Sequence, residues 1–284
     1  MEFRTKVTIT PSERKVAYTD TIVTMGSCFA DSIGEKMLHA GMNVLCNPFG
    51  TLYNPCSIAV ALQRLLDGQH YAASELVERD GLWHSFAHHG KFSTPSQEET
   101  LAQINHSFDR AKQYLLKADI LLLTLGTAWV YERDGKVVAN CHKFPDKEFI
   151  RRCMNTQEVT DILLSTLKQL KALNPHLTIV TTVSPIRHFR DGAHANQLSK
   201  STLLLGLHAL TKQIDNIYYF PAYELMMDEL RDYRFYADDM CHPSSVAVQY
   251  IWEKFQEATM NPPTQQKITE GEKQHRANAH RPLH

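Results

Sequence analysis

A serine, an aspartate and a histidine occur in an order that suits a hydrolase with a side-chain nucleophile. Ser27 follows the short apolar run at 21–25 and precedes apolar residues at helical spacing, which predicts a strand, a tight turn and a helix. Far along the chain, Asp239 stands three residues before His242. In a loop, this spacing lets the carboxylate accept the imidazole Nδ1–H and leaves Nε2 as a general base. The pattern predicts a Ser27 nucleophile served by His242 and Asp239.

Each part of this pattern also has a structural explanation. A Gly-Ser pair at a strand end often forms only a turn with a helix N-cap, and an Asp–His pair can simply stabilise a loop. Cys28, the neighbour of Ser27, is a rival nucleophile. Because Cys28 should begin the helix and point into packing, we assign the nucleophile to Ser27.

Basic side chains follow other predicted elements that should open onto the same crevice. Arg187 and His188 come after the predicted strand at 177–183. His142 and Lys143 come after a hairpin that an Asp-Gly pair marks. A basic lining favours an anionic or polyhydroxylated substrate over a plain lipid ester. The alternative is ordinary solvated surface charge.

The composition excludes several classes of function. A net charge of −1 gives no overall attraction to nucleic acid or to an anionic membrane. No run approaches the roughly 20 apolar residues that cross a bilayer, and the first residues lack the apolar core of a signal peptide. The six cysteines form no C-x-x-C pair, and the histidines at 84, 88 and 89 lack a carboxylate nearby. We therefore expect a cytoplasmic protein with reduced thiols and neither metal nor cofactor.

The alternation of strand and helix patterns predicts an α/β fold with a mostly parallel sheet covered on both faces. With 43% hydrophobic residues, the chain can build a large core. We expect a single domain over residues 1–260 and a polar, loosely ordered tail at 261–284. The expected strands are 6–9, 21–25, 42–45, 118–125, 177–183 and 217–220, and the expected helices are 28–38, 57–66, 98–117, 156–173, 196–215, 223–230 and 244–258.

Beyond these patterns, the sequence resembles a known family. The stretch from Gly26 to Ala30 reads Gly-Ser-Cys-Phe-Ala, the signature of the GSCFA family, which belongs with the SGNH-type (GDSL-like) hydrolases. The resemblance covers roughly residues 20–258, with several motifs in order. The other stretches that look like family motifs are Asn47 to Pro55, Asn140 to Lys143, Ser184 to His188 with Asp191 and Gly192, and Asp239 to His242.

The resemblance implies a flavodoxin-like, three-layer α/β/α fold and a serine-dependent hydrolase ancestry. By position, it makes Ser27 the nucleophile, His242 the base and Asp239 its orienting partner. The Ser27 N–H and the Gly50 N–H would then donate to the oxyanion.

The third family block departs from the SGNH pattern. SGNH enzymes usually carry Gly-x-Asn-Asp there, whereas this chain reads Gly-Thr-Ala-Trp from Gly126 to Trp129. Losing one oxyanion donor typically costs about 10²–10³ in rate, so another group should replace the asparagine. Asn54, Asn140 and the Thr127 hydroxyl are the candidates.

These observations favour an ester hydrolase that removes acyl groups, O-acetyl above all, from a polar or carbohydrate substrate through an acyl-enzyme. Two alternatives remain open. One is transfer of the acyl group to a sugar hydroxyl, and the other is a non-catalytic ligand-binding protein on the same fold. The expected partner is a small-molecule or carbohydrate ester, without nucleic acid or membrane.

Overall fold

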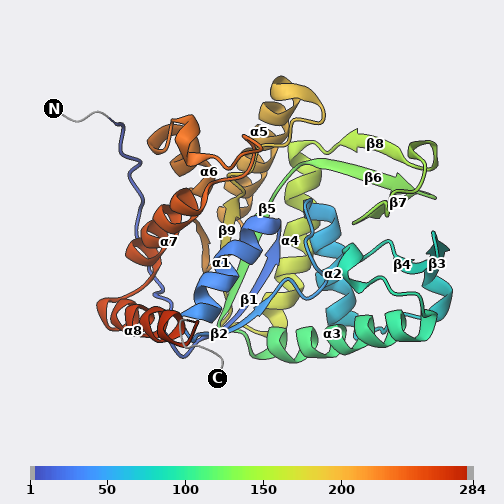
Figure 1. Ribbon diagram of the computed structural model, residues 1–284, viewed down its shortest axis with the longest axis horizontal. Coiled ribbons are helices and arrows are strands. Elements are labelled where there is room, and N and C mark those ends of the chain that lie inside the picture. Colours follow the sequence, from blue (N-terminus) through green and yellow to red (C-terminus); the bar gives the residue numbers. More distant parts are fainter. Residues whose placement is uncertain (1–3, 280–284) are drawn as a thin grey trace.

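A five-stranded parallel sheet forms the centre of the computed structural model, which describes residues 4–279 (Figure 1). Its strand order is β10-β9-β5-β1-β2, the order of flavodoxin-like folds. The predicted α/β class and parallel sheet are confirmed. The strands are β1 (Thr21–Gly26), β2 (Asn43–Cys46), β5 (Ile120–Leu125), β9 (Thr178–Val183) and β10 (Ile217–Tyr219).

Helices cover both faces of this sheet and make it the middle of three layers (Figure 1). Neighbouring strand residues point to opposite faces, so Ile22 packs in one hydrophobic cluster and Val23 in the other. One face carries α1 (Cys28–His39), α7 (Ser245–Thr259) and α8 (Pro262–Ala279), and the other carries α2 (Pro55–Asp67), α3 (Gln97–Lys117), α4 (Thr156–Leu173) and α5 (Gly192–Thr211).

The chain order reverses between β1 and β5, which lie side by side, and ligands of such sheets bind at the strand ends there. Gly26 ends β1 with φ +142°. A Cβ at this position would lie 2.1 Å from the Thr124 carbonyl oxygen. Only glycine can therefore make the turn that leads from β1 into α1.

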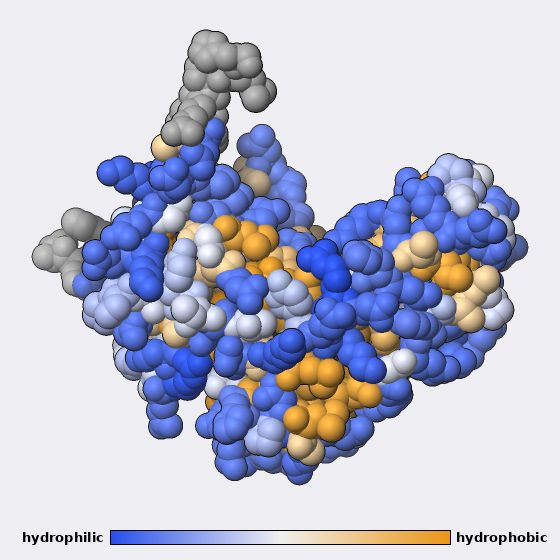
Figure 2. Space-filling view, turned by 90° about the horizontal axis from the view of Figure 1, so that it is seen from below, coloured by the Kyte–Doolittle hydropathy of each residue, from blue (hydrophilic) through white to orange (hydrophobic). Residues whose placement is uncertain are grey.

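Additional strands form a lobe beside the main sheet, at the right of Figure 1. They comprise a two-stranded and a three-stranded antiparallel sheet, and the hairpin predicted from the Asp-Gly pair is confirmed as β6 and β7. Seen from below, the molecular surface is mostly hydrophilic, and its outline is notched between the right-hand part and the rest (Figure 2). The strands are β3 (Leu76–Arg79), β4 (Leu82–Ser85), β6 (Trp129–Arg133), β7 (Lys136–Val138) and β8 (Ile150–Cys153).

The C-terminal segment differs from its prediction as a loose tail. Residues 262–279 form α8, which buries Ile268 and accepts a hydrogen bond from Trp252 Nε1 at Glu272 (3.0 Å). This segment has too few apolar residues to show a helical pattern in the sequence. The helix is instead anchored by contacts with distant elements. Residues 280–284 lie outside the described part.

One further prediction is wrong and another is refined. The strand expected at 6–9 is absent, since the Val7 N–H donates to the Glu229 carboxylate instead of to a neighbouring strand. The segment expected as a helix at 223–230 is helical, with α6 (Ala222–Glu224) continuing into a π-helical turn over Leu225–Glu229.

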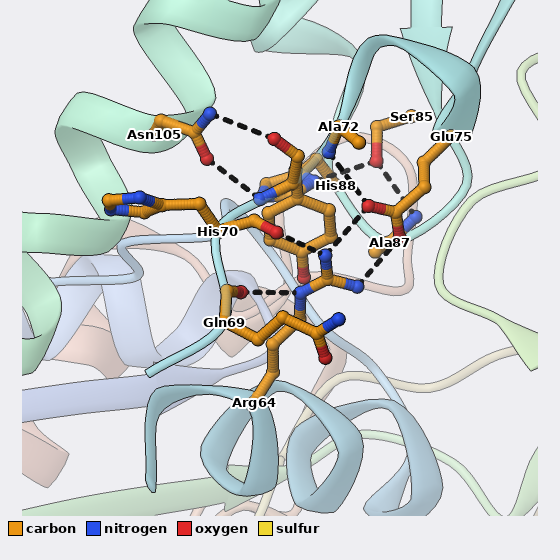
Figure 3. A network of polar contacts seen from close by, with 10 residues as sticks. Arg64, Gln69, His70, Ala72, Glu75, Ser85, Ala87, His88 and Asn105 are labelled. Carbon is orange, nitrogen blue, oxygen red and sulfur yellow. Dashed lines mark hydrogen bonds and ion pairs between the residues drawn. The ribbon is translucent and has the colours of Figure 1, made fainter. Parts of the chain in front are cut away.

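An arginine of α2 ties the lobe to the main body (Figure 3). The Arg64 guanidinium pairs with the Glu75 carboxylate, with both N···O distances at 2.7 Å, and lies 3.6 Å over the Tyr71 ring. It also donates to the carbonyl oxygens of Gln69 and His70. Four hydrogen bonds thus engage this guanidinium within the protein and stabilise the lobe against α2.

His88 lies buried beside this network, and its ionisation should make the protein sensitive to acid. Burial, with the nearby Arg64 and His142 adding to it, lowers the pKa of His88 to about 3. An unfolded histidine titrates near 6.5, so the stability that the neutral ring contributes is present above pH 6.5 and is lost as pH falls toward 3. From pH 7 to pH 5 this one group should cost about 2 kcal/mol.

We expect a His88→Phe variant, which keeps a ring but cannot titrate, to lose less stability than the wild type over that interval. Urea unfolding at pH 7 and pH 5 measures the difference. The exposed His208→Gln serves as control and should follow the wild type. Equal acid sensitivity in His88→Phe and wild type would contradict the prediction.

Candidate active site

The thiol of Cys28 faces His242 at the carboxyl end of β1. Cys28 Sγ lies 3.7 Å from His242 Nε2, and His242 Nδ1 lies 2.5 Å from Asp239 Oδ2. Cys28 and His242 line one pocket of about 300 Å³. A thiol, an imidazole and a carboxylate therefore contact one another in series from Cys28 through His242 to Asp239, the order of contacts that a nucleophilic triad requires.

Ser27 is fully buried and does not line the pocket with Cys28 and His242. Its hydroxyl accepts the N–H of Phe29 at 3.3 Å, which makes it the N-cap of α1. Cys28 begins α1 and packs against a core cluster as predicted, but its thiol also contacts His242 in the pocket, which was predicted for Ser27. With its hydroxyl engaged as the N-cap, Ser27 makes a helix contact in place of the predicted contact with His242.

The Asp-x-x-His loop has the local geometry that its spacing predicts. Asp239 Oδ1 accepts the N–H groups of Cys241 and His242, both at 2.9 Å, while Oδ2 contacts His242 Nδ1. The two backbone N–H donors, with the imidazole, lower the pKa of Asp239 to about 2. The carboxylate is therefore ionised at physiological pH, keeps the proton on Nδ1 and leaves Nε2 as a proton acceptor.

Arg187 supports this loop from outside the pocket. Its N–H donates to the Cys241 carbonyl oxygen at 3.2 Å, and its guanidinium donates to that of Met240. The guanidinium also lies 4.1 Å from the centre of the Tyr236 ring. The sequence predicts Arg187 as a substrate-binding group, but these contacts assign it to holding the loop that carries His242.

The Cys28 thiol is protonated near neutral pH and needs a base. Burial raises its pKa, and this outweighs the opposing effect of the N–H groups of Cys28 and Phe29 at the helix N-terminus. The Asp31 carboxylate raises the pKa further, whereas Lys200 lowers it. With His242 beside it, the thiol fits a nucleophile that loses its proton during attack.

The backbone oxyanion donors expected from the sequence are already occupied. The Ser27 N–H donates to Thr124 O at 3.0 Å, and the Gly50 N–H donates to Asn47 O at 2.8 Å. The N–H of Cys28, in contrast, has no carbonyl partner among residues 4–279. At the first position of α1 it also lies at the positive end of the helix dipole.

The three predicted substitutes for the missing asparagine have other contacts. Asn54 Oδ1 caps α2 by accepting the Ser57 N–H at 2.8 Å. The Thr127 hydroxyl lies on the pocket but is 3.0 Å from the Ser199 hydroxyl. Asn140 Oδ1 accepts the N–H of His142 at 2.9 Å. Of these three residues, only Thr127 lines the pocket with Cys28.

His142 and its neighbours lie in the lobe and not in this pocket. His142 Nε2 is 2.8 Å from the Ser85 carbonyl oxygen, and its ring lies 4.6 Å from that of His84. Asn140 and Lys143 flank it and do not line the pocket with Cys28. The hairpin therefore delivers this motif to β4, a destination that depends on tertiary contacts.

His188 does lie on the pocket. Burial, with smaller contributions from Lys200 and His242 nearby, lowers the pKa of His188 to about 4, so its ring is neutral near pH 7. Its Nε2 is buried without a hydrogen-bond partner, and the ring meets that of Tyr53 edge to face at 6.0 Å. Unpartnered buried nitrogens are rare, which marks His188 as a group with unused hydrogen-bonding capacity.

The sequence did not reveal two aromatic walls and one ion pair of the pocket. Tyr53 and Trp129 supply the walls. Arg151 lies 4.3 Å over the Trp129 ring and pairs through both terminal nitrogens with the Asp191 carboxylate. Because Asp191 compensates this arginine, the lining is less basic than predicted. Arg151 lies on β8, which the sequence patterns did not predict.

The described part of the chain holds no group of three His, Cys, Asp or Glu side chains arranged to bind a metal ion. Within residues 4–279, no helix is long and apolar enough to cross a membrane.

The flavodoxin-like strand order, with helices on both faces of the sheet and an Asp-x-x-His loop before α7, defines a three-layer α/β/α fold. The model of the GSCFA family matches residues 21–255, so the chain belongs to the GSCFA family.

Solved structures give distant similarities. A family 3 carbohydrate esterase from Talaromyces cellulolyticus is 11% identical with a TM-score of 0.39, covering 88% of this chain and 98% of its own. A family 3 carbohydrate esterase from Clostridium thermocellum is 9% identical with a TM-score of 0.41, and the match covers 85% of this chain and 95% of the esterase. An acetyl xylan esterase from the rumen bacterium Butyrivibrio proteoclasticus is 11% identical with a TM-score of 0.42, and the match covers 89% of this chain and 64% of the esterase. No curated protein matches the chain.

Proposed function

We propose that the protein is an acyl-ester hydrolase whose nucleophile is Cys28, with His242 as general base and Asp239 as the group that orients it. The observation that carries this proposal is the 3.7 Å contact between Cys28 Sγ and His242 Nε2, in series with the Asp239 contact to Nδ1. Ser27, buried and engaged as a helix cap, is not proposed as the nucleophile.

In the acylation step, the Cys28 thiol proton passes to His242 Nε2 while sulfur bonds to the acyl carbon. The C–O bond of the ester then breaks, and His242 gives the proton to the leaving alcohol. In the second step, water attacks the thioester and His242 takes a proton from the water. The carboxylic acid leaves, and the same proton restores the Cys28 thiol.

Two groups are suited to hold the negative oxygen of the tetrahedral intermediates. The Cys28 N–H lies at the helix N-terminus without a carbonyl partner, and the neutral His188 ring lines the same pocket. A neutral imidazole can donate one hydrogen bond to this oxygen, and its low pKa keeps it from taking the Cys28 proton in place of His242. We assign His188 to the role that the missing asparagine would have filled.

The pocket suits a short acyl group on a polar molecule. Its volume of about 300 Å³ lies at the lower end of the range of ligand cavities. Tyr53 and Trp129 form its apolar walls, while the Arg151–Asp191 pair leaves polar atoms at the rim. Removal of an acetyl group from a carbohydrate or another polar alcohol is therefore the reaction we favour.

Alkylation of the intact protein with iodoacetamide tests this assignment. Hydrolysis of p-nitrophenyl acetate should fall in proportion to the fraction of Cys28 that mass spectrometry finds modified. The other five cysteines provide an internal control, since the modified fraction of each should not correlate with the loss of activity. Turnover that persists with Cys28 fully alkylated would rule the mechanism out.

Transfer of the acyl group to a sugar hydroxyl is a second candidate, because the Trp129 ring beside Cys28 could pack against an acceptor sugar. Adding xylose or glucose to the reaction distinguishes the two. Transfer predicts acetylated sugar in the products, whereas hydrolysis predicts acetate alone.

A further inference from the structure

One lysine of α5 is sealed beneath the ends of two central strands. Lys200 is 1% exposed, and its Nζ donates to the carbonyl oxygens of Gly126 and Ser184, both at 2.7 Å. Gly126 follows β5 and Ser184 follows β9. The ammonium group therefore joins two neighbouring strand ends at the crevice where Cys28 lies.

This cation lacks a compensating carboxylate. Among residues 4–279, no acidic side chain lies within ion-pair distance of Lys200, and its closest aromatic contact is the Tyr223 ring at 5.6 Å. An unpaired buried charge is costly, and methionine would fill a similar volume without that cost. The presence of a lysine at this depth therefore calls for a functional explanation.

Lys200 acts on the turn that carries the nucleophile. Gly126, whose carbonyl oxygen it binds, packs against Ser27, because a Cβ on Gly126 would lie 3.3 Å from the Ser27 Cβ. Ser27 in turn caps the helix that Cys28 begins. The lysine contact thus holds the layer directly beneath Cys28.

We propose that Lys200 is a positioning residue whose buried ammonium group holds the strand ends under Cys28 and stabilises the thiolate that forms there. The inference rests on Cys28 being the nucleophile. The positive charge of Lys200 favours the thiolate, since it lowers the pKa of the Cys28 thiol.

Other charges also face the thiol, and one of them opposes Lys200. Asp31, on the same helix as Cys28, raises the pKa of the thiol. The remaining titratable groups around the pocket are Tyr53 of the loop after β2, Arg151 of β8, His188, Arg190 and Asp191 of the segment after β9, and Asp239 and His242 before α7.

The test is the rate at which iodoacetamide alkylates Cys28 from pH 6 to pH 9, followed by mass spectrometry in the full chain. It needs no turnover, so it stays informative if the proposed hydrolysis fails. Lys200→Gln keeps a hydrogen-bond donor without the charge, and Lys200→Met removes both. Lys171→Met is the matched control, because Lys171 Nζ also binds two carbonyl oxygens, Pro175 O at 2.9 Å and Leu177 O at 2.8 Å, before the opposite end of β9.

At pH 6 both Lys200 variants should be alkylated about three- to tenfold more slowly than wild type, the effect of raising the thiol pKa by half a unit to one unit. Burial lowers the pKa of Lys200 itself to about 7, so its charge is lost as pH rises. The rates should therefore converge by pH 9. Lys171→Met should follow the wild type, and Asp31→Asn should be alkylated faster.

A deficit in the Lys200 variants that is equal at all pH values would indicate a merely structural lysine and overturn the proposal. So would an equal effect of Lys171→Met. If the Lys200 variants fail to fold, the reciprocal measurement decides: NMR titration of the lysine ammonium groups in wild type and Cys28→Asp, whose carboxylate carries the negative charge throughout the lysine titration. Because coupling is mutual, Lys200 should lose its proton at higher pH in Cys28→Asp, and an unchanged titration would refute the proposal.

Discussion

Replacing Cys28 with alanine should lower kcat/KM for p-nitrophenyl acetate by about 10⁴–10⁶-fold, since removing a nucleophile that acts with its base as a unit can cost about 10⁶. Replacing Ser27 with alanine should leave kcat/KM within about tenfold of wild type, because its hydroxyl is buried against the Phe29 N–H. The Ser27 variant should instead lose about 1 kcal/mol of stability with its helix cap.

The two neighbouring variants serve as each other's controls. Steady-state kinetics and urea unfolding on the same preparations separate a chemical defect from a folding defect. We expect the Cys28 variant to be folded and inactive, and the Ser27 variant to be active and less stable. If Ser27→Ala is inactive but stably folded while Cys28→Ala is active, Ser27 is the nucleophile and the proposal is wrong.

The second large effect should come from the base and its orienting carboxylate. His242→Ala should lose about 10⁴–10⁶-fold in kcat/KM, and Asp239→Asn about 10²–10⁴-fold. An asparagine Oδ1 can still accept the N–H groups of Cys241 and His242, so the loop should keep its shape. The asparagine amide would donate to His242 Nδ1 and so place the ring proton on Nε2. His242 could then no longer accept the thiol proton.

Asp238→Asn, at the preceding position of the same loop, provides the matched control and should retain wild-type activity. The pH profile adds a second measurement. Because the pKa of Asp239 is lowered to about 2, the carboxylate stays charged as pH falls, and no acid limb above about pH 4 should come from it. Comparable activity in Asp239→Asn and Asp238→Asn would show that the Asp239 contact has no catalytic importance.

The assignment of a thiol nucleophile changes how the family signature is interpreted. In Gly-Ser-Cys-Phe-Ala, the serine has the N-cap position and the cysteine the first helical position. Only the second of these projects from the strand end toward His242. The serine and glycine are then explained by the turn: Gly26 adopts a φ that few other residues tolerate, and Ser27 satisfies a helix N–H.

Local patterns in the sequence determined the main elements and one part of the site. The apolar run at 120–125 could only be a buried strand, and the leucines spaced along 156–173 formed the helix that they predict. The Asp239–His242 contact was also predictable, because a carboxylate and an imidazole three residues apart in a loop meet without help from other segments.

Tertiary structure alone decided which side chain faces His242. Ser27 and Cys28 are adjacent, so no periodicity separates them, and the outcome depends on where the helix cap falls relative to a loop over 200 residues away. The same holds for Lys200, whose helical pattern gives no sign that its ammonium group meets the carbonyl oxygens of two strand ends. Spacing along the chain encodes contacts within an element, whereas contacts between elements depend on packing that no short stretch contains.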